Sequence, residues 1–191
     1  MKIVAFAGSP RAKGNTRNML DQFARFAKDF GIETEIIDVP KAKPLACTAC
    51  MGCLKNKNQK CVMTSDPMNE WIEKVTQADG VIVASPTYFA NVTPEIKCLI
   101  DRFGIVARVN DFMWKHKPAA ALVAVRRAGA VPTFDAINRT FQINQMLSVG
   151  SSYWNLGQGL KPGDVENDKE ASANIKTLAE DFAWLINKLK S

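Results

Sequence analysis

The stretch GVIVAS, residues 80–85, decides the fold. Its apolar residues follow one another without alternation, which is the pattern of a strand that is covered on both faces. Strands of this kind occur in parallel sheets that have helices packed on either side. The sheet that contains residues 80–85 is therefore expected to be parallel.

Similar segments lie on both sides of this strand. Four further strands are expected at residues 2–8, 33–39, 119–125 and, in short form, 149–156. Apolar residues at helical spacing predict helices near residues 19–30, 71–78, 94–103, 131–147 and 171–189. Five alternations of strand and helix with right-handed crossovers predict an α/β fold, a doubly wound three-layer sandwich with a five-stranded parallel sheet in the order 2-1-3-4-5.

The composition favours one soluble, cytoplasmic domain over residues 1–191, with a cysteine-rich loop at about residues 40–65. A hydrophobic content of 47% is enough for one core, and no apolar run approaches the roughly 20 residues that span a bilayer. Five cysteines, an odd number, favour a reducing compartment. The 25 Lys and Arg are scattered, which argues against nucleic acid and is compatible with a phosphorylated cofactor or an acidic electron carrier.

Ligands of such sheets bind beyond the carboxyl ends of the strands, and the first such loop reads GSPRAKGNT over residues 8–16. Hydroxyls, an amide and the following helix N-terminus predict a phosphate cradle, with charge from Arg11 and Lys13. The loop lacks both the P-loop ending and the three glycines of a dinucleotide site, so a single phosphate, and hence FMN, is favoured over FAD or NAD. A plain helix cap is the alternative. The candidate residues are Ser9, Arg11, Lys13, Gly14, Asn15 and Thr16.

Two further loops end at the same edge of the predicted sheet. Residues 85–92 read SPTYFANV, and an aromatic pair flanked by proline, hydroxyl and amide groups suits a flat heterocycle. Residues 126–130 add Arg126, Arg127 and Gly129, which suit a reduced anionic flavin or a nicotinamide nucleotide phosphate. The alternative for either arginine is simple exposure to solvent.

Four cysteines lie within fifteen residues, in the pattern Cys47-x2-Cys50-x2-Cys53-x7-Cys61. Thiolates at intervals of three residues can surround one centre, and the bacterial ferredoxin run begins with the same spacing, so an Fe–S cluster is expected. Three alternatives remain. A zinc site lacks a second knuckle and a nearby His, a reactive dithiol lacks a helix N-terminus, and unligated thiols need no further feature.

The remaining polar residues carry no predicted chemistry. His116 is expected to be exposed and structural, and Cys98 to be a small buried residue. Asp38 is interpreted as solvated or capping, and Asp101 and Arg102 as paired with their surroundings near a helix end. The apolar stripe of residues 171–189 is expected to pack on the sheet, with a dimer seam as the alternative.

The motifs GSPRxxGNT, CxxCxxCx7C and SPTYF, followed by residues 96–102, resemble in this order the flavodoxin-like NAD(P)H-dependent FMN reductases, specifically the iron-sulfur flavoproteins. The resemblance covers the whole chain and implies a flavodoxin-like fold with noncovalent FMN. It implies that the phosphate lies on Ser9, Arg11, Asn15 and Thr16, and the isoalloxazine ring on Pro86, Thr87, Tyr88, Phe89 and Asn91. One [4Fe–4S] cluster is implied on Cys47, Cys50, Cys53 and Cys61.

The function implied by this resemblance is electron transfer between the cluster and FMN by an FMN-dependent oxidoreductase. The implied partners are NAD(P)H or a ferredoxin-type carrier, and the implied assembly is a homodimer or homotetramer. No catalytic acid, base or nucleophile is expected, because the cofactors carry the chemistry. Two alternatives stay open: an NAD(P)H-dependent FMN or quinone reductase with an empty cysteine loop, and a nonenzymatic metal- or flavin-binding protein.

Overall fold

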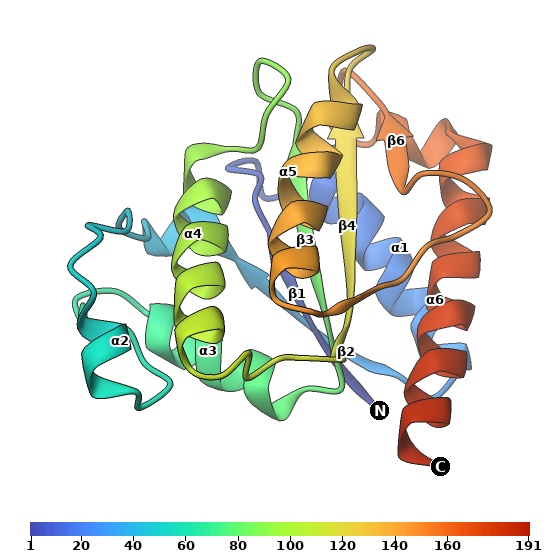
Figure 1. Cartoon of the computed structure of the whole chain (residues 1–191). Coiled ribbons are helices and arrows are strands. Elements are labelled where there is room, and N and C mark those ends of the chain that lie inside the picture. Colours follow the sequence, from blue (N-terminus) through green and yellow to red (C-terminus); the bar gives the residue numbers. More distant parts are fainter.

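A computed structural model describes residues 1–191 and shows a twisted sheet between two layers of helices (Figure 1). The central strand β3 (Gly80–Pro86) pairs with β1 (Lys2–Ala7) and β4 (Pro118–Val125), and β2 (Glu33–Asp38) forms the edge beside β1. All pairings are parallel, and the order β2-β1-β3-β4-β5 confirms the predicted topology.

The prediction of one strand over residues 149–156 was wrong. Two short strands share that edge of β4 instead: β5 (Leu147–Ser148) pairs with its beginning and β6 (Leu156–Gln158) with its end. The residues between them include Gly150 and two serines and leave the sheet, and the Ser151 hydroxyl donates to the Tyr153 carbonyl oxygen at 2.6 Å. The sheet thus has six strands, and β6 directs the following segment toward the carboxyl edge.

Two hydrophobic clusters, one on each face of the sheet, hold the helices in place. Helices α1 (Asn15–Asp29) and α6 (Lys169–Lys190) cover one face, where Phe23 and Phe182 meet edge to face with ring centroids 5.8 Å apart. The stripe of α6 therefore packs on the sheet, as predicted. Helices α3 (Met68–Gln77), α4 (Pro94–Val109) and α5 (Ala130–Ile143) cover the other face.

The helix ends differ from those predicted. Helix α4 continues past residue 103 to Val109, because Val106 and Ala107 extend its buried stripe. Helix α5 ends at Ile143, before the predicted residue 147, and Gln145 beyond it has a positive φ of 57°. Three short helices lie in connections: η1 (Val39–Ala42), α2 (Gly52–Asn56) and η2 (Asp164–Asn167).

Several minor predictions are decided by the same structure. His116 is exposed, as expected, whereas Cys98 is half-buried rather than buried. Asp38 does not cap a helix with its side chain and instead forms ion pairs with Arg17 at 3.2 Å and Lys41 at 3.3 Å. None of the helices combines the length and the apolar character that a membrane crossing requires.

Candidate functional site

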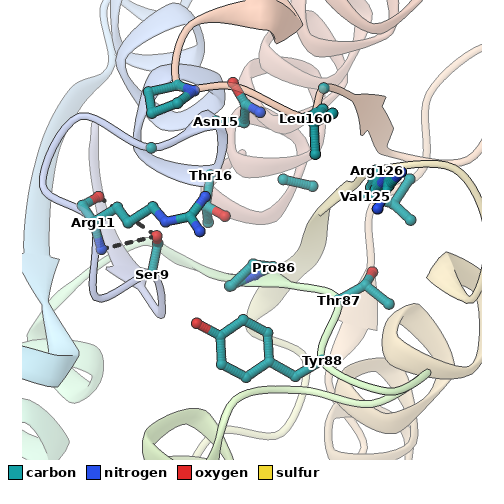
Figure 2. Close-up of a pocket in the computed structure, with 14 residues that line it drawn as sticks. Ser9, Arg11, Asn15, Thr16, Pro86, Thr87, Tyr88, Val125, Arg126 and Leu160 are labelled. Atoms are coloured by element: carbon teal, nitrogen blue, oxygen red, sulfur yellow. Dashed lines mark hydrogen bonds between the residues drawn. The ribbon is translucent and has the colours of Figure 1, made fainter.

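A cavity of about 220 Å³ opens at the carboxyl edge of the sheet, and the loop between β1 and α1 forms one of its walls (Figure 2). We call it the edge cavity. Helix α1 reaches it with its N-terminus, where the N-cap residue Gly14 supplies no side-chain hydrogen bond. The first N–H groups of a helix lack intrahelical partners and attract anions. This end of α1 is therefore suited to a phosphate.

The loop that precedes α1 is held in a tight turn. The Arg11 N–H donates to the Ser9 hydroxyl at 3.2 Å, and the Gly14 N–H donates to the Arg11 carbonyl oxygen at 2.9 Å. A Cβ atom on Gly14 would lie 2.9 Å from the Ser9 Oγ and 3.1 Å from the Arg11 carbonyl oxygen, so the turn requires glycine here. Figure 2 shows the Arg11 side chain extending over the cavity, which adds positive charge to the cradle.

Two threonine hydroxyls in the walls of the edge cavity are buried without a partner. Thr16, only 2% exposed, has no hydrogen bond at Oγ1, and neither does Thr87 on the opposite wall. A buried hydroxyl without a partner costs free energy, so native proteins rarely leave one unsatisfied. A polar ligand in this cavity would give both hydroxyls the partner that they lack.

The second wall comes from the loop after β3. The Thr87 N–H donates to the Ala124 carbonyl oxygen at 2.9 Å, and Tyr88 and Asn91 exchange two backbone hydrogen bonds of 2.8 and 3.0 Å. This short bridge turns Phe89 fully out to solvent, with a positive φ of 46°. The Asn91 side chain forms a local hydrogen bond, in which its Oδ1 accepts from the Val92 N–H at 2.8 Å.

A third wall was not predicted from the sequence. It comprises Gly159, Leu160 and Pro162, which follow β6, and it is tied to the first wall because the Asn15 Oδ1 accepts from the Gly163 N–H at 2.9 Å. The glycine and proline within four residues after the last strand were the available signal. Arg126 also lines the cavity, together with Ala124 and Val125 at the end of β4.

The structure thus brings nine of the predicted residues together around one cavity and leaves four outside it. The nine are Ser9, Arg11, Gly14, Asn15, Thr16, Pro86, Thr87, Tyr88 and Arg126. The four that do not line it are Lys13, Phe89, Asn91 and Gly129. Gly129 supports the cavity without lining it. A Cβ atom at this position would lie 3.3 Å from the Ala90 Cα, so the glycine lets the loop after β4 pack closely against the loop after β3.

The four clustered cysteines line a second, small cavity of about 20 Å³ between their loop and α4. Cys53 is buried, Cys61 is half-buried, and Cys47 and Cys50 are exposed. No group of three or more His, Cys, Asp or Glu side chains is close enough together to hold a metal ion. Four thiols that face one cavity, without carboxylate or imidazole partners, are nevertheless the donor set of an Fe–S cluster.

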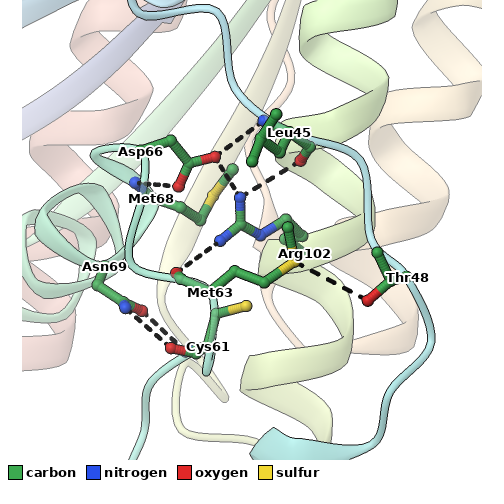
Figure 3. A network of polar contacts seen from close by, with 8 residues as sticks. All are labelled: Leu45, Thr48, Cys61, Met63, Asp66, Met68, Asn69 and Arg102. Atoms are coloured by element: carbon green, nitrogen blue, oxygen red, sulfur yellow. Dashed lines mark hydrogen bonds and ion pairs between the residues drawn. The ribbon is translucent and has the colours of Figure 1, made fainter.

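The anchor of this loop is Arg102, which lies in the middle of α4 rather than near a helix end as predicted (Figure 3). Its guanidinium is buried against Asp66, from the segment that follows the cysteines. Asn69 pins the loop as well, because its side chain accepts from the Cys61 N–H at 2.8 Å and donates to the Cys61 carbonyl oxygen at 2.9 Å. A charged residue on the otherwise apolar stripe with Leu99 and Val106 was the sequence signal for this role.

In the iron-free protein, we expect alkylation of Cys50 at a lower pH than alkylation of Cys98. The Gly52 backbone N–H and the Thr48 hydroxyl lower the pKa of the Cys50 thiol, whereas burial raises the pKa of Cys98. Only the thiolate reacts. Iodoacetamide labelling and peptide mapping between about pH 6 and 9, around the ordinary thiol pKa, measure the order. Equal labelling of both thiols at every pH would contradict it.

Solved structures share this architecture. A flavodoxin from the domain Archaea superposes with a TM-score of 0.58, covering 94% of this chain and 99% of its own at 13% identity. The structure of RosB with a bound intermediate has a TM-score of 0.73, covering 100% of this chain and 80% of its own at 16% identity. At these identities the likeness shows the fold, so the chain has a flavodoxin-like fold.

Sequence comparisons define the family. The model of the family described as NADPH-dependent FMN reductase matches residues 1–161. An iron-sulfur flavoprotein of Methanocaldococcus jannaschii is 31% identical over 195 residues, which cover 100% of both chains. The chain belongs to the NADPH-dependent FMN reductase family and to its iron-sulfur flavoprotein branch, as the motifs indicated. It is therefore an FMN-dependent oxidoreductase.

Proposed function

We propose that residues 1–191 form one flavodoxin-like domain that transfers electrons between FMN in the edge cavity and one [4Fe–4S] cluster on the cysteine loop. FMN can exchange electrons in pairs or one at a time and the cluster exchanges them singly, so together they connect two-electron and one-electron carriers. The observation that carries the FMN half is the phosphate cradle with its unpartnered Thr16 hydroxyl.

The residues present suit FMN along the whole cavity. Arg11 and the N-terminus of α1 would hold the phosphate, and the Thr16 hydroxyl would gain the partner that it lacks. Across the cavity, Thr87 and Tyr88 would contact the ring, with Arg126 at its polar edge. The neighbour RosB supports FMN as the type of ligand, because the riboflavin 5'-phosphate derivative that its structure holds is a close chemical analogue of FMN.

The cluster half of the proposal is supported by Cys47, Cys50, Cys53 and Cys61, which line one cavity, and by the name of the iron-sulfur flavoprotein relative. The direct test is the content of iron, acid-labile sulfide and FMN in protein purified without oxygen. We expect about four iron and four sulfide per FMN, as for one [4Fe–4S] cluster. FMN without iron after attempted reconstitution contradicts the cluster half and leaves the FMN half standing.

A second candidate function is an NAD(P)H-dependent reductase of flavins or quinones whose cysteine loop stays empty. The observation that favours it is that the thiols are not gathered closely enough to hold a metal, with Cys47 and Cys50 exposed. It predicts that iron-free protein with FMN oxidises NAD(P)H with a quinone as fast as iron-loaded protein does.

The electron donor in either case is proposed to be NAD(P)H or a ferredoxin-type protein. The family description supports NADPH, and a net charge of +6 with Arg126 at the cavity suits an anionic donor. A homodimer or homotetramer remains a prediction. The exposed apolar side chains of Phe89, Trp154 and Leu160 are available to be buried in a subunit interface. Sedimentation velocity measures the oligomeric state. A cytoplasmic location also remains a prediction.

A further inference from the structure

Arg102 is the largest fully buried side chain of the protein. It projects from the middle of α4 into the segment that surrounds the cysteines (Figure 3). A buried guanidinium is costly unless charge and hydrogen bonds compensate it, so such a residue calls for a structural or functional reason.

The contacts of Arg102 join the two ends of the cysteine loop. One terminal nitrogen binds the Asp66 carboxylate and donates to the Leu45 carbonyl oxygen at 3.3 Å, and the other donates to the Met63 carbonyl oxygen at 3.2 Å. Leu45 precedes the first of the four cysteines and Met63 follows the last. Asp66 also contacts Leu45 directly, because its carboxylate accepts from the Leu45 N–H at 2.8 Å.

The third nitrogen of Arg102, Nε, is buried and has no partner. Arg102 also lines the cavity that the four cysteines share. A guanidinium stays protonated in proteins even when it is buried, and here the Asp66 carboxylate balances its charge. The guanidinium therefore stays charged beside the thiols, and its Nε–H group has no partner.

We infer that Arg102 is a positioning residue of the cysteine site: it joins the two ends of the loop and presents a fixed positive charge and a free N–H group to the cluster ligands. This inference rests on the proposed function for its second half only. The joining of the loop ends is a property of the iron-free chain as well. Hydrogen bonds and charge near the sulfur atoms are known to set the potential of an Fe–S cluster.

The first test is the midpoint potential of the cluster, from a dithionite titration with mediators in which the cluster takes up one electron. The reduced cluster is the more negative form, so Arg102→Gln is expected to lower the potential and Asp66→Asn to raise it. Arg102→Lys, which keeps the charge, is expected to stay near the wild-type value. Arg108→Gln, an exposed position on the same helix, is the control and should change nothing. A merely structural role would not shift the potential in opposite directions.

The second test uses iron-free protein and does not depend on a cluster. Loss of the Arg102 contacts should let the loop open, so labelling of Cys53 and Cys61 at one pH should be faster by about tenfold or more in Arg102→Gln than in Arg108→Gln. Should Arg102→Gln fail to fold, the double variant Arg102→Met/Asp66→Leu removes both buried charges and fills their space with apolar side chains. It is expected to fold, to bind FMN as wild type does, and to label fast.

The outcomes separate this inference from the proposed function. Wild-type protein without iron after reconstitution contradicts the cluster, and the labelling rates then decide whether Arg102 joins the loop ends. Wild-type protein with a cluster, combined with wild-type potential and labelling in Arg102→Gln, overturns the inference and leaves the proposed function intact. Slow labelling of the folded double variant also overturns it.

Discussion

Cys53→Ala is expected to remove all iron and sulfide from the protein while FMN stays bound. Cys53 is the buried member of the four cysteines and sits on α2, where it faces the cavity that all four share. A [4Fe–4S] cluster needs four ligands, and no fifth cysteine lines this cavity. FMN should be retained because the edge cavity and the cysteine cavity have no lining residue in common.

The matched control for this variant is Cys98→Ala. Cys98 lies on α4, is half-buried, and does not line the cysteine cavity. It should keep iron and sulfide at the wild-type ratio to FMN, so the two variants differ only in whether a ligand is lost. Iron analysis and the visible spectrum of anaerobic samples measure both. Full iron content in Cys53→Ala would mean that the metal is bound elsewhere.

The same cysteine loop shows where sequence reasoning succeeds and where it stops. The spacing of the cysteines predicts that they lie near one another in space, and all four line one small cavity. Their joint binding of one cluster stays a prediction. The spacing does not predict what joins the loop ends, because Arg102 comes from a helix 36 residues beyond Asp66 in the chain. The only local trace of this long-range contact is a charge on the buried face of α4.

The edge cavity shows the same division. The apolar run of residues 80–85 and its equivalents predict the strands, their order and the two loops that follow β1 and β3. This is possible because each strand that is buried on both faces has its own continuous run of apolar residues. The third wall at Gly159 depends on residues 149–155 leaving the sheet and on β6 returning to β4. β6 forms because it pairs with β4, which is distant in the sequence. The local pattern of apolar residues carries no information about such a pairing.

Thr16→Val is expected to change two properties in opposite directions. The FMN-free protein should become more stable by about 1 kcal/mol, because the variant removes a buried hydroxyl that has no partner. The affinity for FMN should fall by about 10- to 100-fold, the usual worth of a hydrogen bond to a charged group such as a phosphate. Urea unfolding of FMN-free protein and fluorescence titration with FMN measure the two changes.

Thr34→Val is the matched control, because the Thr34 Oγ1 is also buried without a partner but lies on β2, away from the edge cavity. It should raise stability by a similar amount and leave FMN affinity unchanged. A gain in stability at both positions with no loss of affinity at either would contradict a role for Thr16 in binding FMN. If only Thr16→Val loses affinity and the variant is more stable than wild type, misfolding cannot explain the loss. The Thr16 hydroxyl then contacts the bound FMN.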